Sequence, residues 1–460
     1  MDRIKWGITA FASAFCFHSF AQDTGPGKKP NVLILLADDL GYGELGAYGQ
    51  QVIRTPNLDA LAEKGLRFTN FYAGCAVCSP SRAVLMTGIQ VGRLSIRGNK
   101  GLLEDGSWDR VALKKSEMTL AEMLRGAGYQ TAFIGKWHLG IPTDLSTWAY
   151  NRGFDYAVQE QWGPKPEGGI FDERVHWVNN RDGSVFYDYT KYSCLDEFRT
   201  DLALKFLDEQ RDLAKPLFLF MSYRTPHAHE YHLRETDLYS DRGWPENERL
   251  HAARITMLDA QIQRLLDKLD ETGELDHTLI LFASDNGPTK EGVDPAFFSA
   301  SGEFRGCKRD VYEGGIRIPF IAVWNGKIPA GRTSDYPGIF YDIMPTLAEL
   351  AGTPAPGQTD GISILPELLG KKQPEHPPLY WEIQLVSGKA GDFRQAARLG
   401  PWKVVRYGSG GAPQLYNLDR DPRETKNVAA GYPEILQKMS TVLKTNSQKS
   451  PNYPYAGRDF

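Results

Sequence analysis

A run of five residues, Cys78-Ser79-Pro80-Ser81-Arg82, combines a thiol, a helix-start signal and a guanidinium. Ser79 is a good N-cap residue and Pro80 a good first helical residue, so the run predicts a helix from Pro80 to about Thr87. Cys78 would lie at the positive end of that helix, where unpaired N–H groups favour an anion. Arg82, one turn later, can direct its charge toward the same place. The run therefore predicts a site for a negatively charged group beside a cysteine.

The cysteines allow two other interpretations of this run. Cys78 could be a structural thiol, or Cys75 and Cys78 could form a Cys-x-x-Cys pair for metal or redox work. The other cysteines of the mature chain, Cys194 and Cys307, are isolated, which argues against a zinc site. Of the five cysteines, Cys16 lies within residues 1–21, which read as a cleaved signal peptide, and the remaining four are too few for a disulfide-stapled scaffold, so no obligatory disulfide is predicted.

Acidic side chains follow two strongly apolar runs. Residues 31–37 and 278–284 are typical of strands buried on both faces of a parallel sheet, and they end in Asp38-Asp39 and Asp285-Asn286. A doubly wound sheet could bring these four oxygen donors to one crevice. They suit a hard divalent cation, and the absence of a histidine-rich set at these strand ends disfavours zinc. Such a cation would polarise an anionic ester oxygen.

Basic and imidazole side chains follow other predicted strands. Lys136 and His138 are two residues apart after a strand over 131–134, and His227 and Lys308 lie on further loops after strands. Each has an ordinary explanation as a surface or core residue. Together with the strand-end acids, they predict a pocket for an anionic ester.

The run from Cys78 to Arg82 resembles the Cys-x-Pro-Ser-Arg signature of the type I sulfatases, the formylglycine-dependent, arylsulfatase-like members of the alkaline-phosphatase superfamily. Further motifs of that family have counterparts here in the same order, and the match extends from Asn31 to Leu415–Glu424. These counterparts are Gly135-Lys-Trp-His-Leu-Gly140, Thr225-Pro-His227, Ser284-Asp-Asn-Gly287 and Arg305-Gly-Cys-Lys308. Cys307 replaces a glycine found in many relatives, a change that we expect to be neutral for the chemistry.

The resemblance implies that Cys78 is converted to Cα-formylglycine, whose hydrate attacks sulfur. A formylglycine-generating or anaerobic sulfatase-maturating enzyme is the implied partner. The resemblance also implies that His138 deprotonates the second hydroxyl of the sulfated hydrate, expelling sulfate. The resemblance implies three further roles. One calcium ion is held by Asp38, Asp39, Asp285 and Asn286 together with Cys78. Arg82 and Lys136 stabilise the hydrate and the sulfate charge, and His227 and Lys308 bind the sulfate and help to protonate the leaving alcohol. The choice of calcium over magnesium as the bound cation rests on the resemblance.

The expected fold is α/β: an alkaline-phosphatase-like, doubly wound, mostly parallel sheet flanked by helices, with a smaller C-terminal α+β subdomain of antiparallel strands and a helix. The chain of 460 residues is long enough for this. Residues 1–21 read as a cleaved signal peptide, which predicts a secreted or periplasmic protein, followed by a catalytic domain over 22–370 and the subdomain over 371–460. No later segment is a transmembrane candidate. A net charge of −4 argues against a nucleic-acid partner.

The substrate is predicted to be a sulfated carbohydrate, such as a glycosaminoglycan, a mucin glycan or an algal galactan. Residues 141–193 are rich in Gly, Pro and aromatics with little periodicity, which predicts an irregular, substrate-facing surface. Aromatic and polar side chains outside the motifs are the candidates for sugar contact. These candidates are Trp108, Trp162, Trp177, Trp381, His176, Glu382, Arg394 and Arg224. The opposing interpretation is that most of these tryptophans pack between the two domains.

Two other functions remain open at this point. A phosphomonoester or phosphonate-ester hydrolase would share the sheet and the strand-end metal, but its two-metal members need extra ligands, for which no obvious second set is present. A non-catalytic glycan-binding protein would keep the fold without the chemistry, yet every expected polar residue is present.

Overall fold

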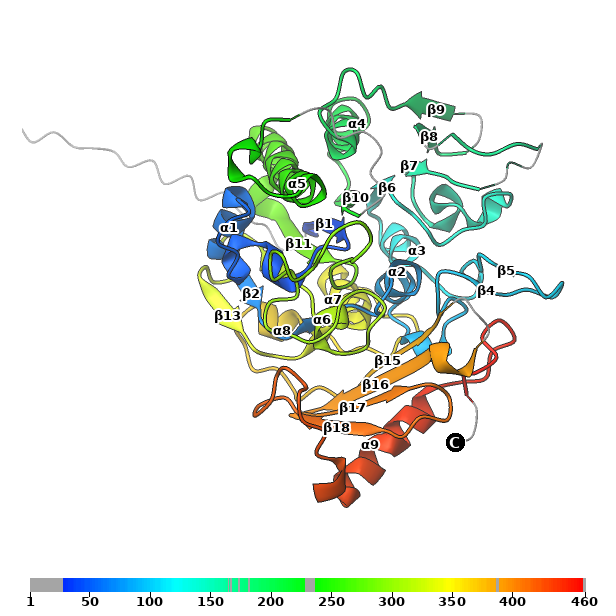
Figure 1. Cartoon of the computed structure of the whole chain (residues 1–460). Helices are drawn as coiled ribbons and strands as arrows, with labels where there is room; N and C mark the ends of the chain where they lie inside the picture. The colour runs from blue at the N-terminus through cyan, green and yellow to red at the C-terminus, as the bar shows by residue number, and fades with distance from the viewer. Residues whose placement is uncertain are drawn as a thin grey trace, which may run out of the picture.

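The computed structural model describes residues 28–163, 165, 168–172, 174–180, 183–227, 236–385 and 389–457. The predicted signal peptide lies outside these residues. Figure 1 shows a large sheet flanked by helices, with a second sheet and helix α9 packed below it. None of the described helices is long and apolar enough to cross a membrane. The predicted fold class is confirmed.

The central sheet contains ten strands in the described part of the chain. Its middle is parallel: β11 pairs with β1, β1 with β10, β10 with β6 and β6 with β7, whereas the β12 and β8–β9 pairings are antiparallel. In spatial order the strands are β13 (Arg332–Ser334), β2 (Leu66–Phe68), β12 (Phe320–Val323), β11 (Thr278–Ser284), β1 (Asn31–Asp38), β10 (Leu217–Pro226), β6 (Gln130–Gly135), β7 (Tyr156–Glu160), β8 (Val175–Val178) and β9 (Gly183–Phe186).

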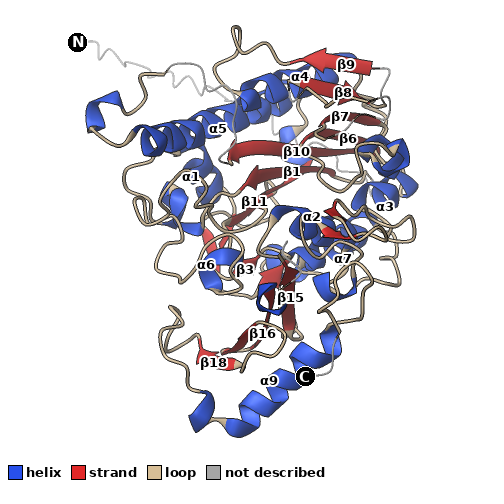
Figure 2. Ribbon diagram, turned by 45° about the vertical axis from the view of Figure 1, so that its right-hand side comes forward, coloured by secondary structure: helices blue, strands red, loops and turns tan. Residues whose placement is uncertain are grey.

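Both faces of this sheet are covered, which explains why its central strands are continuous apolar runs. Along β1, Val32, Ile34 and Leu36 pack into one core cluster, and Leu33 and Leu35 into the other. Figure 2 shows α4 and α5 on one side of β1 and β10, and α2 and α7 on the other. The first cluster holds helices α2 (Cys78–Thr87), α3 (Leu120–Gly126) and α7 (Ile343–Ala351), and the second holds α1 (Pro56–Glu63), α4 (Leu195–Glu209) and α5 (Glu246–Glu271).

The C-terminal part forms a separate antiparallel sheet with α9 (Pro433–Asn446) against it. Its strands are β15 (Leu379–Gln384), β16 (Phe393–Leu399), β17 (Trp402–Tyr407) and β18 (Gln414–Asn417). Trp381 of β15 is fully buried and donates a hydrogen bond from Nε1 to the Ala73 carbonyl at 2.8 Å. One core cluster runs through both sheets, and the division between residues 370 and 371 stays a prediction.

Two local expectations were wrong. Residues 141–193 are not irregular throughout, because they supply β7, β8 and β9 to the central sheet. Helix α2 begins at Cys78, not Pro80, and the Ser79 hydroxyl donates to the His138 carbonyl at 2.8 Å instead of capping the helix. Trp177 is partly exposed and packs edge-to-face against Trp148 and Phe171, and its place at the pocket rim stays a prediction. The remaining short elements are β3 (Phe71–Tyr72), β4 (Gly101–Leu102), β5 (Trp108–Asp109), β14 (Gly338–Ile339), α6 (Glu313–Ile316) and α8 (Leu365–Leu368).

Candidate active site

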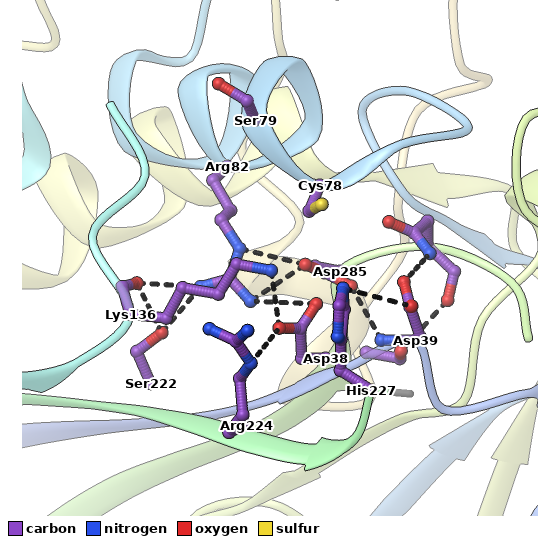
Figure 3. A network of polar contacts seen from close by, with 12 residues as sticks. Asp38, Asp39, Cys78, Ser79, Arg82, Lys136, Ser222, Arg224, His227 and Asp285 are labelled. Atoms are coloured by element: carbon purple, nitrogen blue, oxygen red, sulfur yellow. Dashed lines mark hydrogen bonds and ion pairs between the residues drawn. The ribbon is translucent and has the colours of Figure 1, made fainter. Parts of the chain in front are cut away.

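The carboxyl ends of β1, β6, β10 and β11 meet the start of α2 at one place (Figure 3). Cys78 is the first residue of α2 and points toward Asp38 and Asp285 (Figure 3). Because parallel strands end at the same edge of a sheet, residues more than 200 positions apart become neighbours there. The structure thus brings together all of the residues predicted to catalyse or to bind metal.

Backbone geometry at the strand ends fixes how the chain enters the site. Gly135 has a φ of +121°, and a Cβ on it would lie 1.9 Å from the Ser222 carbonyl oxygen, so only glycine fits between β6 and β10. Asp39 and His138 also have positive φ values, of 66° and 57°. Such conformations cost free energy in non-glycine residues and are concentrated at functional sites.

Three carboxylates converge in this cluster, and all are fully buried. Asp38 accepts from Lys136 Nζ at 2.5 Å, Asp39 from Lys308 Nζ at 2.7 Å, and Asp285 from Arg82 Nε at 2.8 Å. Burial opposes ionisation, but Lys136 and other nearby cations hold the pKa of Asp38 well below its usual value. By contrast, burial and the neighbouring Asp38 charge raise the pKa of Asp285 to about 7.

The oxygen donors fit a hard divalent cation. Asp38 Oδ1 and Asn286 Oδ1 are buried and accept no hydrogen bond from the described residues. Ligand atoms of Asp38, Cys78 and Asp285 lie within 4.8 Å of one another, as do those of Asp38, Asp39 and His227. A bound cation would satisfy these orphaned oxygens and offset the repulsion between the carboxylates.

Cations surround the place to which Cys78 points. Arg82 Nη1 donates to the Lys136 carbonyl at 2.9 Å and to Ser222 Oγ at 2.6 Å, which fixes its plane. Lys136 and Lys308 are buried and their charges act on the Cys78 thiol, although burial still raises the pKa of that thiol. The unmodified thiol is therefore a poor thiolate nucleophile in this environment.

Two imidazoles complete the cluster. Burial, with the charges of Lys136 and Arg110, holds the pKa of His138 well below its usual value, and its Nδ1 is buried without a hydrogen-bond partner among the described residues. His227 Nε2 lies 3.8 Å from Asp39 Oδ2, and burial likewise lowers the pKa of His227. Both imidazoles are therefore neutral near pH 7 and can accept a proton.

One wall of the site is formed by Trp162 and Arg224. The Arg224 guanidinium carbon lies 4.8 Å from the Trp162 ring centroid, Lys136 Nζ lies 5.9 Å from it, and the His138 ring packs edge-to-face at 5.2 Å. Arg224 also forms an ion pair with Glu160 at 2.5 Å. Although burial opposes it, Arg224 and Arg199 lower the pKa of Glu160 to about 2, so this carboxylate stays ionised.

The other predicted sugar contacts do not gather at this wall. His176, Trp381 and Glu382 are completely buried, and they contact Arg199, the Ala73 carbonyl and Arg97 respectively. They lie behind the site, with no exposed surface for a substrate, because their strands β8 and β15 turn these side chains into the core. Arg394 is held by the Arg309 carbonyl and Asp310, and Trp108 lies on the partly exposed β4–β5 hairpin.

Sequence reasoning missed three residues of the site. Asn99 lies 3.7 Å from Cys78 Sγ through Nδ2, and its Oδ1 accepts from the Ser79 N–H at 3.2 Å. Asn99 lies in an irregular loop without a motif, so no sequence signal marked it. Ser222 follows the apolar run 217–221 within β10, the signal that marked Asp38, whereas Glu160 ends β7, a short buried strand without such a run.

Comparisons with known proteins agree on one family. Residues 30–353 match the family described as Sulfatase, and residues 302–449 match the C-terminal region of N-sulphoglucosamine sulphohydrolase. The chain is 32% identical to arylsulfatase A of Homo sapiens, over 92% of this chain and 88% of the relative, and 32% identical to N-acetylgalactosamine-6-sulfatase of Sus scrofa, over 92% and 87%. The crystal structure of Ps i-CgsB in complex with k-i-k-neocarrahexaose is 25% identical, covers 93% of this chain and 95% of its own, and superposes with a TM-score of 0.78. With its alkaline-phosphatase-like fold, the chain belongs to the sulfatase family and is a sulfuric ester hydrolase.

Proposed function

We propose that this sulfatase hydrolyses an O-sulfate ester of a carbohydrate such as a glycosaminoglycan, a mucin glycan or an algal galactan. The observation that carries the proposal is the meeting of Cys78, two buried lysines and three buried carboxylates at the carboxyl edge of the sheet. The names of the relatives support a saccharide: one acts on N-acetylgalactosamine 6-sulfate, and one solved neighbour holds a neocarrahexaose. Trp162 at the wall is partly exposed beside Arg224, so its indole can contact a sugar ring.

Two groups complete the proposed site. The hydrate of a formylglycine made from Cys78 would supply the hydroxyl that attacks sulfur, and one calcium ion held by Asp38, Asp39, Asp285 and Asn286 beside residue 78 would polarise a sulfate oxygen. A formylglycine-generating or anaerobic sulfatase-maturating enzyme carries out the conversion of Cys78. Removal of residues 1–21 during export places the enzyme outside the cell or in the periplasm.

The protein's own residues divide the remaining work. Lys136 is hydrogen-bonded to Asp38 and Lys308 to Asp39, and both lysines present their ammonium groups to the sulfate oxygens. Arg82 keeps the Lys136 backbone in place and adds positive charge beside residue 78. Preorganised cations of this kind stabilise charge that develops in the transition state.

Proton transfer falls to the imidazoles and to Lys308. His138 is neutral and its Nδ1 has no hydrogen-bond partner among the described residues, so it would take the proton of the second hydroxyl at residue 78, the step that expels sulfate. His227 and Lys308, both beside Asp39, bind the sulfate from the other side. The charged Lys308 protonates the leaving alcohol oxygen, and the neutral His227 assists by donating a hydrogen bond to it. Because burial and the neighbouring cations lower the pKa of His138, its imidazole stays unprotonated and can act as a base over the neutral pH range.

The proposal is tested by sulfate release from saccharides that carry sulfate at defined ring positions. The enzyme is produced together with a formylglycine-generating enzyme, and the mass of the peptide containing residue 78 verifies conversion. We expect release from at least one saccharide by the wild type and none by Cys78→Ala. A matched phosphate ester should be hydrolysed far more slowly, since the described acid, histidine and cysteine clusters share Asp38 and form one cation site. Rapid turnover of an aryl sulfate with no release from any saccharide would overturn the carbohydrate assignment.

A further inference from the structure

Arg110, beside the catalytic cations, has no acidic partner among the described residues. It follows β5 directly and is half-buried. Its one hydrogen bond is long, 3.4 Å from Nη1 to Gln161 Oε1. The nearest acids are engaged elsewhere: Asp109 faces Lys100 at 3.8 Å, and Glu160 is paired with Arg224 and Arg199. The charge of Arg110 is therefore not neutralised within the described part of the protein.

Arg110 is joined to the active site by Trp162. Its guanidinium carbon lies 4.7 Å from the centroid of the Trp162 ring, the same ring that Arg224 approaches at 4.8 Å and Lys136 at 5.9 Å. The His138 ring contacts this indole as well. One aromatic ring thus separates the charge of Arg110 from the groups expected to act on the sulfate.

The three cations around Trp162 differ in how their charges are compensated. Lys136 is paired with Asp38, and Arg224 with Glu160. Arg110 forms no such pair among the described residues, and burial lowers its pKa. A partly buried cation without an acid is costly, and such groups at the edge of a site commonly find their counter-charge on a ligand. A guanidinium offers a fork of N–H donors that matches a carboxylate or a sulfate.

We propose that Arg110 and Trp162 form a subsite for a second anionic group of the substrate, a carboxylate or a second sulfate carried next to the scissile sulfate ester. The exposed part of the Trp162 indole contacts the sugar ring, and Arg110 binds the anion. This inference rests on the proposed action on carbohydrates and narrows it to polyanionic saccharides. It also gives the β4–β5 hairpin, which delivers Arg110 and is anchored through Asn452 near the C-terminus, a part in substrate selection (Figure 1).

The test compares Arg110→Gln with the wild type on three disaccharides that share the scissile sulfate and differ in the neighbouring sugar: neutral, uronate-bearing and doubly sulfated. We expect the ratio of kcat/KM for the preferred anionic substrate to that for the neutral one to fall about tenfold, mainly through KM, because a charge-assisted bond is lost. Arg110→Lys should restore part of the ratio. Lys100→Gln, which removes an exposed charge from the same hairpin, is the matched control and should leave the ratio unchanged. Comparison of the uronate-bearing and the doubly sulfated disaccharide shows whether Arg110 binds a carboxylate or a sulfate.

Two results would overturn the subsite. One is an equal loss of kcat/KM on all three disaccharides, which would mark Arg110 as structural, and the other is a wild-type enzyme that does not distinguish them. If no saccharide is desulfated, the proposed function fails, and the subsite is then tested through inhibition of aryl sulfate hydrolysis by an unsulfated uronate disaccharide and its neutral methyl ester. Stronger inhibition by the uronate in the wild type than in Arg110→Gln would support the subsite, and equal inhibition would refute it.

Discussion

Among the clusters of charged side chains buried in the described part of this protein, two differ clearly in what they leave unsatisfied. The catalytic cluster at the carboxyl edge of the central sheet contains Asp38, Asp39, Asp285, Arg82, Lys136 and Lys308. The interface cluster lies between the two sheets and contains Tyr72, Glu313, Arg317, Arg398, Lys403 and Glu424. In the first, three carboxylates converge and several polar atoms are orphaned. In the second, two carboxylates meet three cations.

The interface cluster is closed around Glu313. Lys403 Nζ lies 2.8 Å from one oxygen of Glu313 and 3.0 Å from Glu424, while Tyr72 and Arg317 donate to the other Glu313 oxygen at 2.7 and 2.8 Å. Burial opposes ionisation, yet Lys403 and Arg317 hold the pKa of Glu313 far below its usual value. Burial and buried charge are therefore shared by both clusters. What marks the catalytic one is the convergence of three carboxylates around oxygens that accept no hydrogen bond from the described residues, Asp38 Oδ1 and Asn286 Oδ1. Glu424 Oε1 of the interface cluster also accepts none, but it lies 3.0 Å from Lys403 Nζ.

The sharpest contrast is expected from the same substitution in each cluster. Lys136→Met should lower kcat/KM about 10³-fold, roughly 4 kcal/mol of transition-state stabilisation, because one preorganised donor to the sulfate is removed. Folding should change little in saturating calcium, since the cation and Arg82 still balance Asp38. Steady-state kinetics and thermal unfolding measure the two effects. Near wild-type turnover by Lys136→Met would remove this lysine from the mechanism.

Lys403→Met, the matched variant, should show the reverse pattern. Removal of this fully buried lysine leaves Glu313 and Glu424 facing each other, and breaking a buried ion pair typically costs about 3 to 4 kcal/mol. The free energy of unfolding, from denaturant titration, should fall by that amount, whereas kcat/KM of the folded fraction should stay within about threefold. A large fall in kcat/KM at unchanged stability would mean that the interface cluster acts on the chemistry.

The contrast also shows what could be predicted from the sequence. The catalytic cluster was predicted because each carboxylate follows an apolar run long enough to be recognised as a buried strand, and the ends of parallel strands coincide. The interface cluster has no such signal. Glu313 and Lys403 are 90 residues apart, on a four-residue helix and an antiparallel strand, and only the packing of the two sheets makes them neighbours.

The substrate wall was predicted less well for a related reason. Residues 141–193 were read as irregular, yet they hold β7 and with it Glu160, which orients Arg224. β7 is short and ends in Gln159 and Glu160, and β8 and β9 are only partly buried, so none of the three has the apolar run that marks a central strand. The direction in which a side chain points could not be predicted from the sequence pattern either. Trp381 and Glu382 were expected to contact the substrate, but both lie on β15 and are buried in the core.

Calcium binding should stabilise the fold through the catalytic cluster and not through the interface cluster. The comparison uses one carboxyl from each cluster, and the two have similar pKa values. Burial raises the pKa of both Asp285 and Glu424 to about 7. Calcium at a hundredfold excess over its Kd should stabilise the wild type by about 2.7 kcal/mol. Asp285→Asn should lose most of this gain, because a ligand is removed, and Glu424→Gln should keep it. Thermal unfolding with calcium and with a chelator measures the difference without requiring activity. An equal calcium response in both variants would exclude Asp285 as a ligand.

The smallest expected effect is a pH dependence that belongs to the interface cluster. Burial, together with the Glu313 charge, raises the pKa of Glu424 from the ordinary 4.5 to about 7, against the opposing effect of Lys403. Between these values the folded protein holds a proton that the unfolded chain has released, so stability falls as pH rises from about 5 to 7 and then levels off.

Glu424→Gln removes this titration, so its loss of stability between pH 5.5 and 7.5 should be smaller than that of the wild type by about 2 kcal/mol. Denaturant titrations in saturating calcium keep Asp285 ionised throughout and isolate Glu424. If the two proteins show parallel pH profiles, Glu424 is ionised in the folded state and Lys403 neutralises both of its carboxylates. The interface would then be held by a fully ionised cluster, as the catalytic site would be with a cation bound, and the convergence of three carboxylates on one cation site would distinguish the two.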